Sequence, residues 1–371
     1  MRDDTVTLFL CGDVMLGRGI DQILPRPGNP ALRESHVRDA RTYVDLAEAR
    51  NGPIPRPADP GWPWGDALPL LDAARPDVRV VNLETSVTRS ADFAPGKPVH
   101  YRMSPANVAA LTVARPDVTV LANNHVLDFG RRGLTETLDV LAGAGLRVAG
   151  AGRDAEQAWQ PAAVPLGDTR VLVWSFAAPS SGVPAGWAAA PDRPGVAYLP
   201  DLSDDAAGAV TRRVRRVKRP GDVVVASVHW GSNWGYEVAA DQIRFAHALV
   251  DAGVDVVHGH SSHHPRPVEV YHGRLILYGC GDLVNDYEGI SGYRAYRDDL
   301  RLLYLVSFAA RTGELAAMRM IVLRANRMRL ERATGRDARW LGDVLDSVSR
   351  QRGARITTGS DGTLHVASAP R

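Results

Sequence analysis

The fold is decided by the opening stretch Thr5-Val6-Thr7-Leu8-Phe9-Leu10-Cys11-Gly12-Asp13. Its apolar side chains over residues 5–11 predict a buried strand, and Gly12-Asp13 follows where that strand ends. Open α/β sheets place their sites just past the carboxyl ends of their strands. The glycine permits tight backbone geometry, so the carboxylate of Asp13 can approach a cation. The start of the chain therefore indicates an α/β fold with a site at the strand ends.

Further polar clusters follow apolar runs along the rest of the chain. They are Asn82-Leu83-Glu84-Thr85, Asn123-Asn124-His125, His229-Trp230-Gly231, the run from His258 to His264, and Gly281-Asp282. Apolar residues at 77–81, 117–121, 222–228 and 254–257 predict the strands that precede the first four clusters. Collected in space, these oxygen and nitrogen donors suit one or two divalent ions of Mn, Zn or Fe rather than a cysteine-based structural zinc.

Helical stretches alternate with the expected strands. We expect helices at 31–50, 104–114, 133–144, 201–219 and 239–252, and further strands at 147–149, 170–176, 268–271, 275–278, 302–308 and 315–323. This alternation of strands and helices predicts a mixed sheet with helices outside it. The polar, proline-rich segment 25–63 is expected to form a lid or insert of a main domain over residues 1–325, and residues 326–371 a C-terminal helical extension.

Composition narrows the classes of function. The chain has 371 residues and a formal net charge of +2, so no global positive field indicates nucleic acid as a partner. Its two cysteines, Cys11 and Cys280, cannot build a disulfide framework, which favours a reducing compartment. We find neither a signal segment nor an apolar run long enough to span a bilayer, and therefore expect a cytoplasmic protein without a membrane partner. The sequence carries no prediction of oligomeric state.

Several residues in the clusters suit proton transfer or metal binding. The imidazole of His125 can move a proton, and Asp128, three residues later, can orient that ring. Glu84 can bridge two cations or act as a base. Four imidazoles between His258 and His264 are costly unless they are solvated, protonated or metal-bound. Of these four we prefer His260 and His263 as ligands, with the other two as substitutes.

Other residues suit substrate binding. Arg18 lies close to the first cluster and can contact an anionic group. Trp230 and Trp234 flank the cluster at His229 and can form an aromatic wall of a pocket. These assignments place a substrate beside the predicted metal ions.

The clusters together resemble the CapA family, named for poly-γ-glutamate capsule synthesis, which is similar to calcineurin-like metallophosphoesterases. The specific matches are Gly12-Asp13-Val14-Met15-Leu16-Gly17-Arg18, Asn82-Leu83-Glu84-Thr85, Ala122-Asn123-Asn124-His125 with Asp128-Phe129-Gly130, and His229-Trp230-Gly231. The resemblance implies a four-layer α/β/β/α sandwich. It also implies that His125 is the catalytic imidazole and that the metal ligands are Asp13, Glu84, Asn124, His229 and His263.

The chain departs from the family pattern at three places. Metallophosphoesterases usually carry a histidine at the position of Met15, which weakens one metal position and argues against phosphodiester hydrolysis. Ser261-Ser262-His263 stands in place of His-Pro-His, so one imidazole is missing. Gly281-Asp282 stands in place of Gly-Asn and adds a carboxylate, which we assign to substrate binding.

The resemblance leaves four functions open. The first is a metal-dependent enzyme that hydrolyses or transfers a peptide or poly-γ-glutamyl amide, with His125, Asp128, Glu84 and His263 as catalytic residues. The second is epimerisation at a peptide Cα, which needs a cation and two acid/base groups. The third is a non-catalytic role in polymer synthesis, and the fourth is phosphoester hydrolysis.

Overall fold

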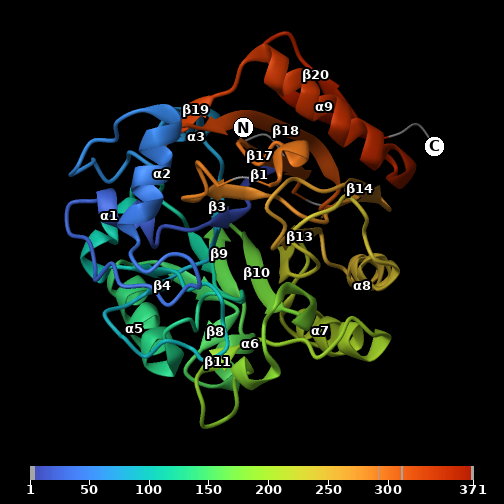
Figure 1. Ribbon diagram of the computed structural model, residues 1–371. Coiled ribbons are helices and arrows are strands. Elements are labelled where there is room, and N and C mark those ends of the chain that lie inside the picture. The colour runs from blue at the N-terminus through green and yellow to red at the C-terminus, as the bar shows by residue number, and fades with distance from the viewer. Residues whose placement is uncertain (1–4, 291, 311, 369–371) are drawn as a thin grey trace.

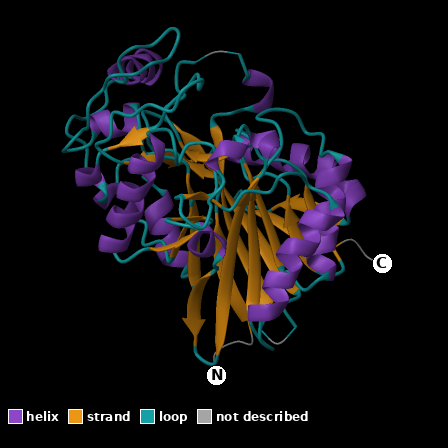
Figure 2. Ribbon diagram, turned by 90° about the horizontal axis from the view of Figure 1, so that it is seen from below, coloured by secondary structure: helices purple, strands orange, loops and turns teal. Residues whose placement is uncertain are grey.

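Two large β-sheets form the centre of the protein, and helices lie on the outer face of each (Figure 1). The computed structural model describes residues 5–290, 292–310 and 312–368. Seen from below, the strands stand together in the middle with helices on both sides (Figure 2). Among the described residues, no helix combines the length and apolar character needed to cross a membrane.

The larger sheet has eleven strands and begins with the predicted opening strand. Its main path is β16 (Asp282–Val284), β2 (Asp13–Val14), β3 (Val78–Leu83), β1 (Thr5–Leu10), β17 (Leu300–Ala309), β18 (Leu315–Ala325), β21 (Leu364–Ser368) and β20 (Ala354–Thr358). Three more strands branch from this path: β6 (Val118–Val120) pairs with β3, β7 (Arg147–Ala149) pairs with β6, and β19 (Leu330–Arg332) pairs with β18. Both β1 and β2 run parallel to β3. Gly12 lies between β1 and β2, and the chain keeps the same direction through both strands toward the site.

The smaller sheet has six strands in the order β14 (Val268–Tyr271), β15 (Arg274–Leu277), β13 (Val256–His260), β12 (Val223–His229), β10 (Thr169–Ala177) and β9 (Ala162–Leu166). The four central strands are parallel, and both edge strands are antiparallel. The predicted strands after residue 160 and the predicted hairpin are thus present. The carboxyl ends of β12 and β13 lie side by side, because His229 pairs with His260.

Three apolar cores separate four layers. Leu8 and Val80 of the larger sheet meet Val173 and Val225 of the smaller sheet in the core between the sheets. A second core joins the larger sheet to α1 (Gly19–Ile23), α2 (Arg41–Asn51), α3 (Ala67–Ala74), α4 (Ala109–Thr112) and α5 (Gly130–Gly143). A third joins the smaller sheet to α6 (Ala155–Trp159), α7 (Asp204–Val217) and α8 (Ala240–Asp251). The predicted α/β/β/α sandwich is confirmed.

The segment between the first strand and α3 is mostly irregular chain. The helix predicted over residues 31–50 begins only at Arg41, and the helix predicted over 104–114 is a 3-10 turn, Pro105–Asn107, followed by the short α4. Arg18 fixes this region to the body of the protein through ion pairs with Glu34 and Asp286 at 3.0 and 2.5 Å.

The predicted loop at 180–200 contains two 3-10 turns and the short strand β11 (Gly195–Val196), which pairs with β8 (Ala151–Gly152). A further short pair is β4 (Ser86–Val87) with β5 (Arg102–Met103).

The C-terminal region is not the purely helical extension that we predicted. It contains α9 (Gly335–Ser349), but β20 and β21 follow as a hairpin, and β21 pairs with β18. Leu341 and Leu345 of α9 enter the core between the sheets. Residues 335–368 therefore complete the larger sheet and close one end of the sandwich (Figure 1).

Candidate metal centre

The candidate centre lies where strands of the two sheets end opposite each other. Asp13 of β2 pairs in register with Asn82 of β3 on one side and Asp282 of β16 on the other. The amide of Asn82 donates to Oδ1 of Asp13 at 2.6 Å and so fixes the carboxylate. A side chain at Gly12 would place its Cβ 1.6 Å from the carbonyl oxygen of Gly281, so the close approach of the two Gly-Asp turns requires glycine.

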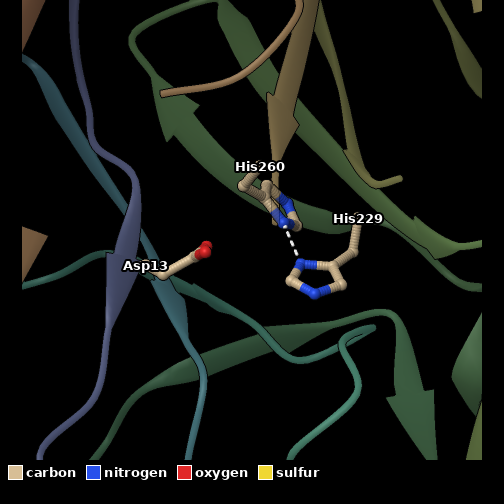
Figure 3. A group of neighbouring side chains, drawn as sticks. All are labelled: Asp13, His229 and His260. Carbon is tan, nitrogen blue, oxygen red and sulfur yellow. Dashed lines mark hydrogen bonds between the residues drawn. The ribbon is translucent and has the colours of Figure 1, made fainter. Parts of the chain in front are cut away.

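The first group of potential ligands consists of Asp13, His229 and His260. One donor atom from each lies within 4.8 Å of the others, and all three side chains are fully buried. Figure 3 shows both imidazoles and the carboxylate pointing toward a common space. The two Nδ1 atoms face each other at 2.7 Å, and burial lowers the pKa of both rings well below its usual range. Both histidines are therefore neutral, the state in which imidazole binds a metal.

A second group consists of Asp13, His263 and Asp282. Nδ1 of His263 lies 3.0 Å from Oδ1 of Asp282. Burial opposes charge on both side chains, but their attraction outweighs it: the pKa of His263 is raised and that of Asp282 is lowered. Asp282, which we assigned to substrate binding, thus lies among the potential metal ligands.

Negative charge at the shared aspartate is poorly compensated by the protein. Burial raises the pKa of Asp13 to about 7, although a hydrogen bond with Glu84 acts in the opposite direction. Burial and then the nearby Asp13 raise the pKa of Glu84 well above its usual range. Oε2 of Glu84 is buried and has no hydrogen-bond partner among the described residues. Converging oxygen and imidazole donors with one orphaned carboxylate oxygen fit divalent cations.

His125 and Asp128 form a buried pair beside these groups. Nδ1 of His125 lies 2.6 Å from Oδ2 of Asp128, and Nε2 lies 3.7 Å from Oε1 of Glu84. Tyr101 packs edge-on against the His125 ring at 4.6 Å. Burial lowers the pKa of His125 to about 4 although Asp128 opposes the shift, so the ring is neutral near pH 7. Asp128 therefore accepts the Nδ1 proton, and Nε2 presents its lone pair to the centre.

Lys97 is a site residue that the sequence did not indicate to us. Its Nζ lies 2.6 Å from Oδ1 of Asp128 and 3.3 Å from Nδ1 of His125, and it also donates to the carbonyl oxygen of Asn124. The available signal was its rarity, because the chain has only one other lysine, Lys218. The ammonium group holds the Asp128 carboxylate and opposes a positive charge on His125.

The remaining predicted ligands lie at different distances from the centre. Oδ1 of Asn124 is 3.2 Å from Nε2 of His229, so this amide borders the first group. His258 instead lies 2.7 Å from the carbonyl oxygen of Cys11, and Nδ1 of His264 lies 3.0 Å from its neighbour's carbonyl oxygen. The structure thus brings His260 and His263 into the two groups and leaves the two substitutes outside them.

The residues that we predicted to bind substrate differ in whether they are available to contact one. Trp234 stands 5.4 Å from His263, ring to ring, and can form an aromatic wall. Trp230 does not line an open pocket: it is 1% exposed and packs in the core beneath the smaller sheet. Arg18 is held between the rings of Tyr43 and Tyr101 and by two carboxylates, so it positions the insert instead of presenting a free cation.

The fold and this geometry define an α/β sandwich protein with a candidate two-metal site at its strand ends. Residues 7–287 match the family described as "Bacterial capsule synthesis protein PGA_cap", and the chain belongs to this family. The CapA resemblance of the sequence is thereby confirmed.

Two relatives of similar sequence support this membership. The chain is 54% identical over 368 residues to the "Probable polyglutamine synthesis accessory protein" of Mycobacterium tuberculosis, covering 99% of this chain and 97% of that protein. It is 26% identical over 310 residues to the "PGA biosynthesis protein CapA" of Bacillus subtilis, covering 81% and 68%. A solved 5'-nucleotidase precursor from Thermus thermophilus is 16% identical with a TM-score of 0.48, and the match covers 94% of this chain and 59% of that one.

Proposed function

We propose that this protein is a metal-dependent enzyme that cleaves or transfers an amide bond of a peptide or poly-γ-glutamyl chain. The observation that carries the proposal is Asp13, which belongs to both groups of potential ligands, beside a neutral His125 whose Nε2 faces the same space. The names of the relatives from Mycobacterium tuberculosis and Bacillus subtilis support a polymer of glutamate or glutamine as the substrate class.

The residues of the two groups would hold the cations. Asp13 would be shared, with His229 and His260 on one side and His263 and Asp282 on the other. Bound divalent cations supply Lewis-acid chemistry that polarises an amide carbonyl and favours attack by water. Glu84 and Asn124 border this space and can complete the donor set.

Proton transfer falls to His125. Attack of water on the amide carbonyl releases a proton, and Nε2 of His125 can accept it because Asp128 holds the opposite nitrogen in its protonated form. The same nitrogen can then give the proton to the departing amine, which leaves a carboxylate and a free amine as products. Lys97 keeps Asp128 charged and thereby keeps the ring in this orientation.

The test is cleavage of poly-γ-glutamate and short γ-glutamyl peptides by the metal-loaded protein, measured as new amino groups. His125→Asn should lower the rate by about 100-fold or more while metal content stays unchanged. His272→Asn is the matched control, because that side chain is 69% exposed.

Other outcomes identify the alternatives. Equal behaviour of His125→Asn and the parent would contradict the proposal and favour a non-catalytic role in polymer synthesis. Uptake of solvent deuterium at a peptide Cα without cleavage would replace hydrolysis by epimerisation. Faster turnover of a simple phosphodiester than of any amide would replace it by phosphoester hydrolysis.

A further inference from the structure

A cavity of about 350 Å³ lies beside the candidate centre. Tyr287 belongs to both places: it lines the cavity, and its ring stands 5.3 Å from that of His263. The volume is at the lower end of the range for small-molecule sites. Four arginines line it: Arg50 of α2, Arg297 just before β17, Arg301 near the start of β17, and Arg324 of β18.

Two of the three acidic residues of this cavity are already engaged by other groups. Asp299 binds Arg297 at 2.7 Å and Arg324 at 3.2 Å. Glu288 accepts hydrogen bonds from the backbone amides of residues 327 and 328 and from the side chain of Asn51. Burial raises the pKa of the third acid, Asp298, and so disfavours its charged form.

Two of the four arginines have no carboxylate in direct contact within the described part of the chain. Neither Arg50 nor Arg301 forms an ion pair among the described residues. Arg50 is exposed at the last turn of α2, whereas Arg301 of β17 is only 1% exposed. Asp282, Asp298 and Asp299 are charge neighbours of Arg301, but none of them lies within ion-pair distance of it. A buried guanidinium with no carboxylate in direct contact still gains from an anion in the cavity.

The contacts of Arg301 within the described chain leave its Nε atom without an acceptor. Its Nη1 atom donates to the carbonyl oxygens of Asp298 and Leu300, and Nη2 donates to Oδ1 of Asn285 at 3.0 Å. Its buried Nε has no hydrogen-bond partner among the described residues. A carboxylate oxygen can accept from such a donor in a charge-assisted hydrogen bond.

A hydrogen-bonded chain connects this arginine with the candidate centre. Asn285 accepts from Arg301 and donates through Nδ2 to Oδ2 of Asp282 at 2.6 Å, and Asp282 contacts His263. An anion in the cavity would therefore lie next to the centre, within reach of the same substrate molecule.

We propose that this arginine cavity binds a carboxylate of the glutamyl chain whose neighbouring amide reaches the candidate metal centre. The identity of the chain rests on the proposed function, whereas the preference for a carboxylate rests on the cavity itself. A γ-linked glutamyl chain keeps one free α-carboxylate on every residue. A glutaminyl side chain offers only a neutral carboxamide, which gains less from two unpaired guanidinium groups.

The test is calorimetric titration of the full-length, metal-loaded protein with tetra-γ-glutamate and with the same peptide carrying α-carboxamides. The acid should bind at least about tenfold more tightly than the amide. Arg50→Gln should weaken binding of the acid by about tenfold, and among the described residues this exposed side chain forms no ion pair. Arg301→Gln should weaken binding further, and Arg301→Lys should restore part of the loss. Arg89→Gln, an exposed arginine paired with Glu136, should change nothing.

The outcomes separate this inference from the proposed function. Equal affinity for acid and amide, or parent-like binding by Arg50→Gln and Arg301→Gln, would overturn the carboxylate site even if amide cleavage is observed. Tighter binding of inorganic phosphate than of tetra-γ-glutamate would also overturn it. Arginine-dependent binding of the acid by a protein that holds no metal and cleaves nothing would support the site and contradict the enzyme.

Discussion

Buried carboxylates in two regions of this protein have pKa values shifted in opposite directions. Asp346 of α9 accepts hydrogen bonds from Arg350, Arg355 and the backbone amide of Ile356 at 2.6, 3.0 and 2.9 Å. Burial opposes its charge, but these three donors outweigh burial and lower its pKa to about 2. At the candidate centre, burial raises the pKa of Asp13 and of Glu84.

This difference in hydrogen-bond donors distinguishes a structural carboxylate from carboxylates that can bind a metal ion. Asp346 joins α9 to β20, and both of its carboxylate oxygens accept hydrogen bonds from the protein. At the strand ends the same chain buries Asp13 and Glu84 with few donors and leaves Oε2 of Glu84 unpaired. A cation bound by Asp13 and Glu84 would explain why the fold retains these buried acidic groups with so few donors.

The largest expected effect is stabilisation by metal. Adding Mn²⁺ or Zn²⁺ at about 100 times its dissociation constant should stabilise the chelator-treated protein by about 2.7 kcal/mol, because the ions bind the folded centre. The midpoint of thermal unfolding should rise accordingly. Asp13→Ala should abolish the rise, since both groups share this residue, and Asp346→Asn should keep it. A full rise in Asp13→Ala would show that the ions bind elsewhere.

A second effect is expected at the structural carboxylate. Asp346→Asn should lower the free energy of unfolding by about 1–3 kcal/mol, because charge-assisted hydrogen bonds to two arginines are lost. Chemical denaturation measures the change, and metal uptake should stay as in the parent. Asp168→Asn, at an exposed turn, is the matched control. Loss of metal uptake in Asp346→Asn would break the distinction between the two regions.

A change of the opposite sign is expected at Glu84. Glu84→Gln should stabilise the chelator-treated protein at pH 7 by about 1 kcal/mol. Burial raises the pKa of Glu84, so folding must either bury its charge or take up a proton, and glutamine requires neither. The same substitution should reduce the stabilisation that metal ions give. Chemical denaturation with and without Mn²⁺ measures both changes. A destabilised chelator-treated variant would mean that the carboxylate has a structural partner.

The smallest effect is a dependence on acid pH. The pKa of Asp346 is about 2 in the folded protein against an ordinary value of 3.8, so its contribution to stability is fully present above about pH 4. This contribution is lost as the pH falls from about 4 through 2. The thermal midpoint of Asp346→Asn should therefore decline less steeply over this range than that of the parent and of Asp168→Asn. Parallel curves for all three proteins would contradict the assignment.

The sequence predicted the strands and their alternation with helices because these signals are local, whereas the four-layer sandwich was implied by the family resemblance. The fully buried strand β3 reads as a continuous run, since its alternate residues face the core between the sheets and the core beneath the outer helices. The C-terminal strands were missed because β20 has only five residues and, within the described chain, pairs only with β21, which the rest of the sheet must first hold in place. Pairing between distant segments leaves no signature within a short window.

The candidate site was predictable in its members but not in its contacts. Strand-end position sufficed to select Asp13, His229 and the run from His258 to His264, because parallel strands bring such ends together. The resemblance, not the strand end, implied His263 as a ligand. It could not show that Asp282 faces His263, since this depends on the pairing of β16 with β2. Nor could it show that Trp230 turns into the core, since tryptophan suits a core and a pocket wall equally.

The measurement that tests the central claim most directly is the metal content of the purified full-length protein, determined by elemental mass spectrometry beside an Asp13→Ala/His263→Ala double variant. We predict about one or two Mn, Zn or Fe ions per chain, lost in the double variant while circular dichroism shows an unchanged fold. A protein without bound metal even after supplementation, or a double variant that retains the parent's metal, would contradict the account.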